Sequence, residues 1–554
     1  MSSAIRERLA LAERSFRSGD ILSCESLLEQ ILSSAPSNAK ANELMAYVAG
    51  QRGDWDKAFA LLKRCTSGSD ASAEAWYYLG TLFLKRGQCE DAIEGFRNSL
   101  TKGGKFFEGL HDLGLSLNKC GRYQEALRSY DEALSIQPKS AVAWSNRGVS
   151  LRHLRRYRES LESLDKALAL APDFADAWIN RGVTLYRSAR YQDALESYRK
   201  ASSLEPDSVD IRTHEGTALS ALRRFDEAWA SYGRALALDP SDANAQWNEA
   251  LSRLAAGELD TGFEKYEARW SRTEAEPLRH THIPLWLGRQ SLQGRRILVW
   301  AEQGYGDTIQ FCRYVPLLAQ LGAEVTFEVP RTLETLMGSL EGGRIVAEGG
   351  EVPEADYQTP LVSLPLAFRT KLETIPSAAR YLKAHPAHVA AWGGRLGGGS
   401  GKRRIGIACS GRETFPDNHN RSMALSHFAA LQELGQLYVI QKELREDDRG
   451  FLARSGGMEF PGGSVSDFHD TAAIIENLDL VISTDTSVAH LAAALGKPVW
   501  ILLCWAPDWR WLVDRADNPW YPSATLFRQD RPGDWEGLMA KVATAAAMTT
   551  VRWR

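Results

Sequence analysis

Residues 141–174 (AVAWSNRGVSLRHLRRYRESLESLDKALALAPDF) and residues 175–208 (ADAWINRGVTLYRSARYQDALESYRKASSLEPDS) decide the fold of the first half of the chain. The two stretches align without a gap, and the same 34-residue period gives eight units over residues 5–276. A small residue stands at the eighth position of each unit, as at Gly148 and Gly182, and a proline ends five of the units. The apolar spacing predicts two helices in each unit, packed closely at the small residue and stopped at the proline.

Because these positions recur together, the pattern resembles tetratricopeptide repeats. Such units stack into a right-handed superhelix, and the resemblance implies a groove that binds an extended peptide, so a protein partner is expected. Polar residues at the sixth position of several units resemble the asparagine ladder of O-GlcNAc transferases. We expect them to bind an acceptor, although asparagine is also common there in repeats that bind differently: Asp112, Asn146, Asn180, His214 and Asn248.

Composition narrows the class of protein. The 554 residues are 44% hydrophobic with a formal net charge of −4, which predicts several folded domains and no general attraction to nucleic acid. The longest apolar run that we find, residues 499–506, is far shorter than the roughly 18 residues that span a bilayer, so we expect a soluble, cytoplasmic protein without membrane insertion. The seven cysteines form no C-x-x-C pair, which favours reduced thiols and no metal site.

After residue 276 the period stops, and strands rich in β-branched residues alternate with helices. We predict a linker over 277–293, a Rossmann-like domain over 294–392, a glycine-rich hinge over 393–402 and a second Rossmann-like domain over 403–554. Predicted helices include 308–321 and 425–434. Two doubly wound domains each have a ligand crevice at the carboxyl ends of their strands, so function is expected between them.

Strand-to-helix turns carry the candidate chemical groups. At Gly304-Tyr-Gly-Asp307 the glycines allow close backbone approach, and the aspartate is either a general base or simply a helix cap. At residues 483–490 a strand leads through hydroxyl groups into a helix, an arrangement that binds phosphate, with His490 one turn in. Gln441-Lys442 and Arg421 follow other strands and offer groups that would neutralise a departing diphosphate.

Three segments together resemble heptosyltransferases (glycosyltransferase family nine) in bacterial proteins that also carry tetratricopeptide repeats: residues 302–314, residues 479–492, and the tail segments 507–511 and 518–522. The resemblance implies a GT-B fold and an inverting, metal-independent transfer without a cofactor, from a nucleotide-sugar donor held mostly by the C-terminal half. It assigns the base to Asp307 and the nucleotide-phosphate loop to Asp485, Thr486 and His490, while Gln441-Lys442 more loosely resembles the diphosphate-contacting Gln and Lys of O-GlcNAc transferases. We expect donor binding also by Gly304, Gly306, Ser410, Arg421 and Ser487.

The chain departs from these relatives at two positions. Cys409 stands where relatives commonly have tryptophan, and Tyr305 stands beside the proposed base where an aliphatic residue is usual. Either change is expected to alter sugar choice. The tail aromatics (Trp505, Trp509, Trp511, Trp520 and Tyr521) are predicted to pack rather than to stack on a ligand.

The sequence thus predicts transfer of a sugar to Ser or Thr of a protein recruited by the repeats, with a flagellar or other surface protein as the acceptor that the resemblance suggests. Two alternatives stay open. One is a non-catalytic repeat scaffold whose GT-B part senses a nucleotide sugar. The other is a transferase that acts on a saccharide or lipid, with the repeats only docking it to an assembly.

Overall fold

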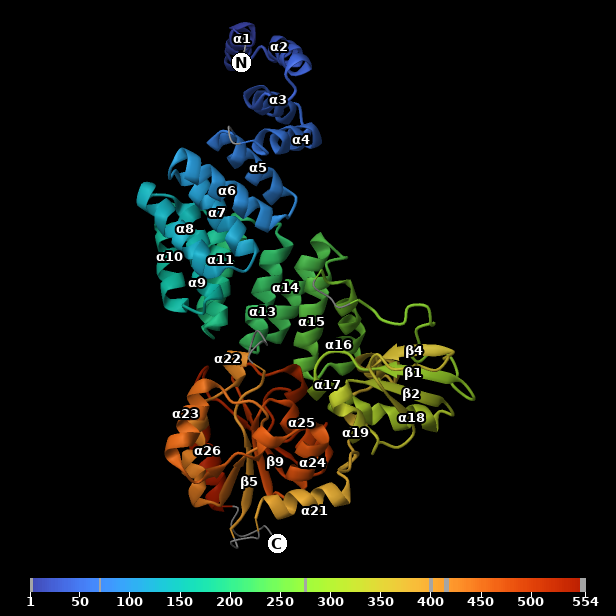
Figure 1. Ribbon diagram of the computed structural model, residues 1–554. Helices are drawn as coiled ribbons and strands as arrows, with labels where there is room; N and C mark the ends of the chain where they lie inside the picture. Colours follow the sequence, from blue (N-terminus) through green and yellow to red (C-terminus); the bar gives the residue numbers. More distant parts are fainter. Residues whose placement is uncertain (1–2, 69–70, 274–276, 398–401, 413–417, 549–554) are drawn as a thin grey trace. The chain divides into compact units, whose positions relative to one another are not determined.

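The computed structural model describes residues 3–68, 71–273, 277–397, 402–412 and 418–548 (Figure 1). The chain divides into two compact units. The first holds residues 1–188 and 196–206, and the second holds residues 189–195 and 207–554. The second unit therefore contains the last two predicted repeats as well as the α/β part of the chain.

The first unit is made of paired antiparallel helices, as the repeat pattern predicts. The bounds are α1 Ser3–Arg17, α2 Ile21–Ser34, α3 Ala39–Gln51, α4 Trp55–Thr66, α5 Ala73–Lys85, α6 Cys89–Gly103, α7 Phe107–Lys119, α8 Tyr123–Ile136, α9 Ala141–His153, α10 Tyr157–Leu170, α11 Ala175–Arg187 and α12 Tyr191–Leu204, the last of which starts in the second unit.

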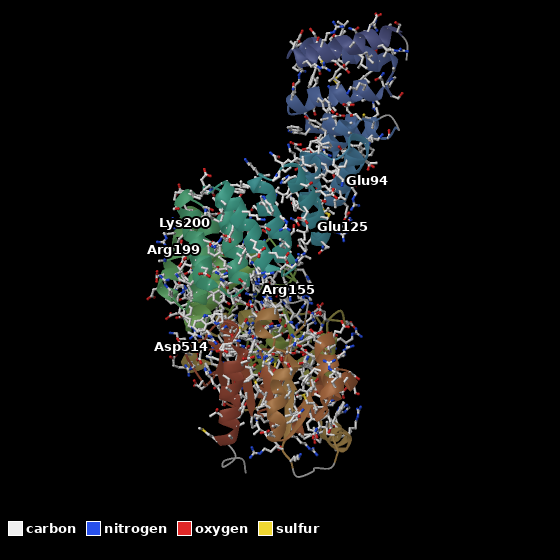
Figure 2. All side chains as sticks on the ribbon, turned by 90° about the vertical axis from the view of Figure 1, so that its left-hand side faces the viewer. Glu94, Glu125, Arg155, Arg199, Lys200 and Asp514 are labelled. Atoms are coloured by element: carbon white, nitrogen blue, oxygen red, sulfur yellow. A yellow bond between two sulfur atoms is a disulfide. The ribbon has the colours of Figure 1, made fainter. Side chains whose placement is uncertain are left out.

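The turn between the two helices of a repeat uses a left-handed backbone conformation. The residue there is glycine in most repeats, for example Gly121 with φ 74°, but it is Arg155 (φ 59°) between α9 and α10 (Figure 2). Glycine adopts this conformation without strain, whereas a side chain with a Cβ atom costs free energy. The regular period therefore extends to the backbone angles of the turns.

One cysteine expectation was wrong. Cys89 and Cys120, whose Cα atoms lie 6.0 Å apart, form a disulfide. Stacking brings the start of α6 beside the end of α7, which places two residues 31 positions apart within bonding reach. The other five cysteines are free, and four of them are buried.

The second unit begins with four further repeat helices and continues with two parallel sheets. The helices are α13 Val209–Ala221, α14 Phe225–Leu238, α15 Ala243–Ala256 and α16 Leu259–Tyr266, followed by the 3-10 turn η1 Glu267–Ser271. The first sheet has the order β3-β2-β1-β4 and the second β10-β9-β8-β5-β6-β7. One hydrophobic core runs from α15 and α16 through both sheets.

The strands of the first sheet are β1 Arg296–Trp300, β2 Glu324–Val329, β3 Arg344–Ala347 and β4 Tyr357–Pro360. Those of the second are β5 Arg404–Ala408, β6 Gln436–Val439, β7 Met458–Glu459, β8 Leu480–Thr484, β9 Val499–Leu503 and β10 Ala524–Arg528. The α-helices of this part are α17 Tyr305–Phe311, α18 Val315–Gln320, α19 Glu334–Met337, α20 Leu364–Ala367, α21 Pro386–Arg395, α22 Asn418–Arg421, α23 Glu446–Ser455, α24 Phe468–Glu476, α25 Ser487–Ala494 and α26 Trp535–Met548.

Two predicted helices were wrong in detail. The stretch 308–321 is broken into α17, a 3-10 turn and α18. Pro316 lies in the first turn of α18, where backbone N–H groups have no partner inside the helix, so the N–H that proline lacks costs no helical hydrogen bond. The stretch 425–434 is a 3-10 helix, η6 Leu425–Glu433. The predicted hinge also overlaps α21, while residues 398–401 lie outside the described part of the chain. None of the helices in the described ranges is both long and apolar enough to cross a bilayer.

Close packing inside a repeat gives a direct stability prediction. A Cβ atom added at Gly216 of α13 would lie 2.6 Å from Cε1 of Tyr232, whose ring is only 1% exposed and has no room to move. We expect Gly216→Ala to lower the free energy of unfolding by about 1–3 kcal/mol through overpacking. The matched control is Gly233→Ala on α14, where an added Cβ meets nothing within 4 Å.

The control substitution is expected to raise stability by up to about 1 kcal/mol, because alanine favours a helix over glycine. Denaturant unfolding of both variants beside the wild type measures the difference. Equal stabilities for the two variants would contradict the packing assigned to Gly216.

Candidate functional site

The loop after β1 carries the proposed base. It runs through Gln303, which has a left-handed φ of 64°, to Gly304, the N-cap of α17. Asp307 lies at the third position of this helix, and its Oδ2 accepts a hydrogen bond from the Gly304 backbone N–H at 2.9 Å. The aspartate therefore does cap the helix, while its side chain stays 19% exposed. Capping uses one oxygen lone pair and leaves others able to accept a proton.

The loop after β8 supplies the second half of the site. Thr486 is the N-cap of α25, and its hydroxyl lies 3.0 Å from that of Ser483. Ser487 opens the helix, and Asp485 is 7% exposed. The Thr484 hydroxyl is fully buried, and no partner for it is found among the described residues. A helix start of this kind attracts an anion through its backbone N–H groups.

The two loops meet because α17 packs on α25. A Cβ atom at Gly306 would lie 2.9 Å from Cδ2 of His490, so only glycine lets the helices approach this closely. His490 is 5% exposed, and its ring stacks on Trp511 with the centroids 4.9 Å apart. Its Nδ1 lies 2.8 Å from the hydroxyl oxygen of Tyr521. The site thus joins the carboxyl ends of strands in both sheets, where open α/β sheets bind ligands.

An arginine that the sequence interpretation did not single out lies at the centre. Arg510 forms an ion pair with Asp307 and a second one, of 2.8 Å, with Asp508. Its guanidinium carbon lies 4.3 Å from the centroid of the Trp509 ring. The signal in the sequence was an arginine between two tryptophans at 509–511, in a tail segment that carries the family resemblance but whose aromatic residues we expected only to pack. Four of the five tail aromatics are buried, as the packing prediction expects: Trp509, Trp511, Trp520 and Tyr521. Trp505 is half-buried and donates to the Ala221 carbonyl at 3.0 Å.

Burial controls the charges of the site. It raises the pKa of Asp307, an effect that the Arg510 guanidinium opposes. It also lowers the pKa of His490 well below the ordinary value, and Arg510 adds to this, so the imidazole is neutral at pH 7. Burial, together with the Asp508 carboxylate, raises the pKa of Asp485 to about 6. A neutral imidazole still donates one hydrogen bond.

Other predicted donor-binding residues have internal partners. The Gln441 side chain accepts from the backbone N–H of Cys409 at 2.7 Å and of Ser410 at 3.3 Å, and it donates to the Ser410 hydroxyl at 2.9 Å. Its amide therefore holds the turn after β5. The ammonium group of Lys442 donates to the Ser466 carbonyl at 3.1 Å. The positive charge of Arg421, at the end of α22, lowers the pKa of both Asp485 and His490.

The two departures from the family pattern differ in position. Cys409 is fully buried beside Asp448, and burial raises the pKa of its thiol to about 12, so it is a protonated core residue. Tyr305 packs edge-on against Phe468 at 5.0 Å and under the Arg412 guanidinium at 5.6 Å. Tyr305 therefore joins residues of the two sheet domains beside the base.

Ladder residues of the first unit are bonded to neighbouring repeats. Asp112 accepts from the Tyr77 hydroxyl at 2.7 Å, Asn146 lies 3.1 Å from Nε2 of His111, and Asn180 donates to Ser145 at 3.3 Å. These bonds give the ladder a role in packing between repeats. In the second unit His214 is half-buried on α13, and Asn248 donates to the Asn244 carbonyl at 2.8 Å.

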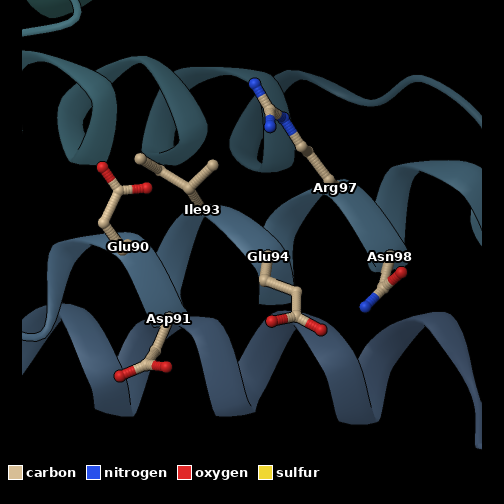
Figure 3. Close-up of a pocket in the computed structure, with 6 residues that line it drawn as sticks. All are labelled: Glu90, Asp91, Ile93, Glu94, Arg97 and Asn98. Carbon is tan, nitrogen blue, oxygen red and sulfur yellow. The ribbon is translucent and has the colours of Figure 1, made fainter.

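A depression of about 400 Å³ lies on α6, and Figure 3 shows the side chains that line it on this one helix. They are Glu90, Asp91, Ile93, Glu94, Arg97 and Asn98, and none belongs to the site above. Within the described part of the chain, no group of three or more His, Cys, Asp and Glu side chains is placed to hold a metal ion.

Comparisons with known proteins agree with the two halves of the chain. Tetratricopeptide-repeat profiles match residues 45–104, 114–154, 147–208 and 214–271, and the profile described as glycosyltransferase family 9 (heptosyltransferase) matches residues 466–532. Protein FlbA of Caulobacter vibrioides is 29% identical over 322 residues, which are 53% of this chain and 53% of that protein. The chain thus spans about half the length of this curated relative.

Segments of the chain are also similar to solved structures. A thermophilic tetratricopeptide-repeat protein from Thermus thermophilus is 22% identical with a TM-score of 0.30, covering 33% of this chain and all of its own. The Cut9–Hcn1 assembly of the APC/C is 18% identical with a TM-score of 0.36, covering 46% of this chain and 50% of its own. From the profile matches and FlbA, the chain is a tetratricopeptide-repeat protein with a C-terminal glycosyltransferase domain.

Proposed function

We propose that the chain is an inverting, metal-independent glycosyltransferase of the GT-B fold, which moves a sugar from a nucleotide-sugar donor to a Ser or Thr hydroxyl of a protein. The observation that carries this proposal is the meeting of α17 and α25. A partly exposed carboxylate, Asp307, lies on the first helix, and an anion-attracting helix start with His490 lies on the second.

The proposed reaction is a single displacement. Asp307 takes the proton from the acceptor hydroxyl while the hydroxyl oxygen forms a bond to the anomeric carbon. The bond from that carbon to the donor phosphate breaks, and its electron pair leaves with the nucleoside diphosphate. The charge that develops on the leaving group falls at the start of α25, where Thr486 and Ser487 present backbone N–H groups.

His490 is proposed as a neutral donor to the leaving group. The hydroxyl of Tyr521 lies 2.8 Å from Nδ1 and is suited to donate to it, which would leave the imidazole proton on Nε2. Lys442 and Arg421 supply further positive charge. The chemistry that these side chains offer requires no cofactor.

The proposed acceptor is a protein chain bound by the repeats. Binding far from the reacting hydroxyl lowers the barrier by holding that hydroxyl in place. A flagellar or surface protein remains the candidate that the family resemblance offers, and a cytoplasmic location is part of the same proposal. The donor sugar and its nucleotide are to be found by screening.

Thermal-shift screening against ADP-, UDP-, GDP- and CMP-sugars tests the donor site. A ligand at about 100 times its Kd stabilises the native state by about 2.7 kcal/mol, which raises the Tm by several degrees. We expect one nucleotide class to do so in the wild type and His490→Ala to lose most of the shift. The control is His427→Ala, whose ring hydrogen-bonds the Ala424 carbonyl on η6.

If His490→Ala keeps the Tm shift, the donor does not bind at the start of α25. If no nucleotide sugar in a wide panel shifts the Tm, the alternative of a non-catalytic repeat scaffold is favoured. Incubation with donor and candidate acceptor proteins then separates an enzyme from a sensor, because a sensor leaves the donor intact.

A further inference from the structure

The last repeat reaches the loop that carries Asp307. Arg269, in the turn after α16, is 6% exposed and forms two hydrogen bonds to Glu302, from Nε at 3.0 Å and from Nη2 at 2.9 Å. Glu302 is 8% exposed and stands two residues before Gly304. Two parallel hydrogen bonds from a guanidinium to a carboxylate fix both the position and the direction of the Glu302 side chain. The backbone that leads into α17 is therefore anchored on repeat eight.

Tyr266, the last residue of α16, makes a second attachment. Its hydroxyl accepts a hydrogen bond from Nε2 of Gln303 at 3.0 Å, although the Gln303 side chain is otherwise on the exposed surface. The Tyr266 ring is 2% exposed and packs on Trp509 with the centroids 6.1 Å apart. Trp509 in turn lies under Arg510, the partner of Asp307.

Tyr266 thus contacts both structures that determine where Asp307 lies. One is the loop that precedes the carboxylate, and the other is the tryptophan beneath its arginine. The charges of the ion pair are close enough to affect Tyr266. Burial raises the pKa of Tyr266 to about 12, the Arg510 guanidinium lowers it and the Asp307 carboxylate raises it. The tyrosine is therefore a protonated side chain at neutral pH, with its hydroxyl directed at the loop.

We propose that Tyr266 is a positioning residue for the reaction, so that repeat eight belongs to the catalytic site and is more than a docking module. This inference rests on the proposed glycosyltransferase function. The hydroxyl holds Gln303 at its left-handed angle, and this fixes the start of α17 and the direction of Asp307. Small displacements of a base cost rate because proton transfer needs hydrogen-bond geometry.

Tyr266→Phe is the appropriate variant. It removes one hydroxyl and keeps the ring that packs on Trp509, whereas removing Arg269 would leave the buried Glu302 without its partner and endanger folding. The matched control is Tyr232→Phe, at the same position of repeat seven, whose ring is 1% exposed and whose hydroxyl lies 3.3 Å from that of Thr217.

We expect Tyr266→Phe to lower kcat about tenfold with the KM for the donor unchanged within twofold, while Tyr232→Phe keeps wild-type kcat. A merely structural tyrosine would instead lower the Tm of both variants alike and leave kcat equal. Such a result, or a loss confined to KM, would overturn the proposal.

A double-mutant cycle with Gln303→Leu makes the test specific. If the two side chains act through one hydrogen bond, the double variant loses no more rate than either single variant. Losses that multiply would overturn the proposal. If the wild type transfers no sugar from any donor, the proposed function itself fails and this inference fails with it. Transfer by the wild type with no effect of Tyr266→Phe refutes only the role of Tyr266.

Discussion

Replacing Asp307 with asparagine is expected to lower the rate of sugar transfer by about a thousandfold, while donor binding and folding are retained. The amide has the same shape, and its one oxygen accepts from either the Gly304 N–H or the Arg510 guanidinium, whose charge stays paired with Asp508. The amide takes no proton from an acceptor hydroxyl. A positioned general base contributes about 10²–10⁴ in rate. Single-turnover transfer and the donor-induced Tm shift, measured on the same sample, separate chemistry from binding.

The control for this prediction is Asp508→Asn. Asp508 is the other carboxylate on Arg510, with a side chain that is 39% exposed. Its loss leaves the base in place, so the rate should fall less than tenfold. Transfer by Asp307→Asn within tenfold of the wild type would show that another group accepts the proton.

The pH profile gives a second measure of the same carboxylate. Burial raises the pKa of Asp307 above the ordinary aspartate value, so wild-type kcat/KM should fall at acid pH through a pKa above 3.8. This acid limb should be absent in the residual activity of Asp307→Asn. A limb that is unchanged in the variant would belong to another group.

The repeats were predictable because the same residue pattern occurs eight times in succession. Where the small residue of a repeat is glycine, it faces a large side chain of the same repeat, as Gly216 faces Tyr232, so the same packing geometry recurs along the array. The strands Arg344–Ala347 and Tyr357–Pro360 were missed, because each has only four residues and the second ends in proline. Short strands of this kind are set by their neighbours in the sheet rather than by local sequence.

The site was predictable where its residues share a turn, and not where distant segments meet. Asp307 and His490 stand in strand-to-helix turns, which have a recognisable order of glycines and hydroxyls. Arg510, Tyr521 and Tyr266 reach the site from the tail and from repeat eight, and local spacing does not indicate which distant loop such residues contact. The period also ends at residue 276, whereas the compact second unit already includes residue 207.

The central ion pair is expected to control stability as well as chemistry. Arg510→Met removes the guanidinium that pairs with Asp307 and Asp508, where the side chains of Arg510 and Asp307 are only 8% and 19% exposed. Loss of one partner from a buried ion pair costs about 3–5 kcal/mol, because the remaining charge stays away from water. For a unit of this size that corresponds to a fall in Tm of roughly 4–7 °C at pH 8.

The fall should shrink as the pH is lowered. Without Arg510, only the backbone hydrogen bonds at the start of α17 oppose the rise that burial causes in the pKa of Asp307, so the folded-state pKa lies further above the unfolded value. A carboxyl group with a raised folded-state pKa destabilises the fold at high pH, and this cost disappears as the group takes up a proton. The Tm difference between variant and wild type should therefore be smaller at pH 5 than at pH 8. Arg515→Met is the control, since its ion pair with Asp517 is 38% and 70% exposed and such pairs contribute about 0–1 kcal/mol. A Tm difference that is the same at both pH values would mean that Asp307 keeps its charge without Arg510, and the carboxylate would then have to be stabilised by the α17 backbone alone.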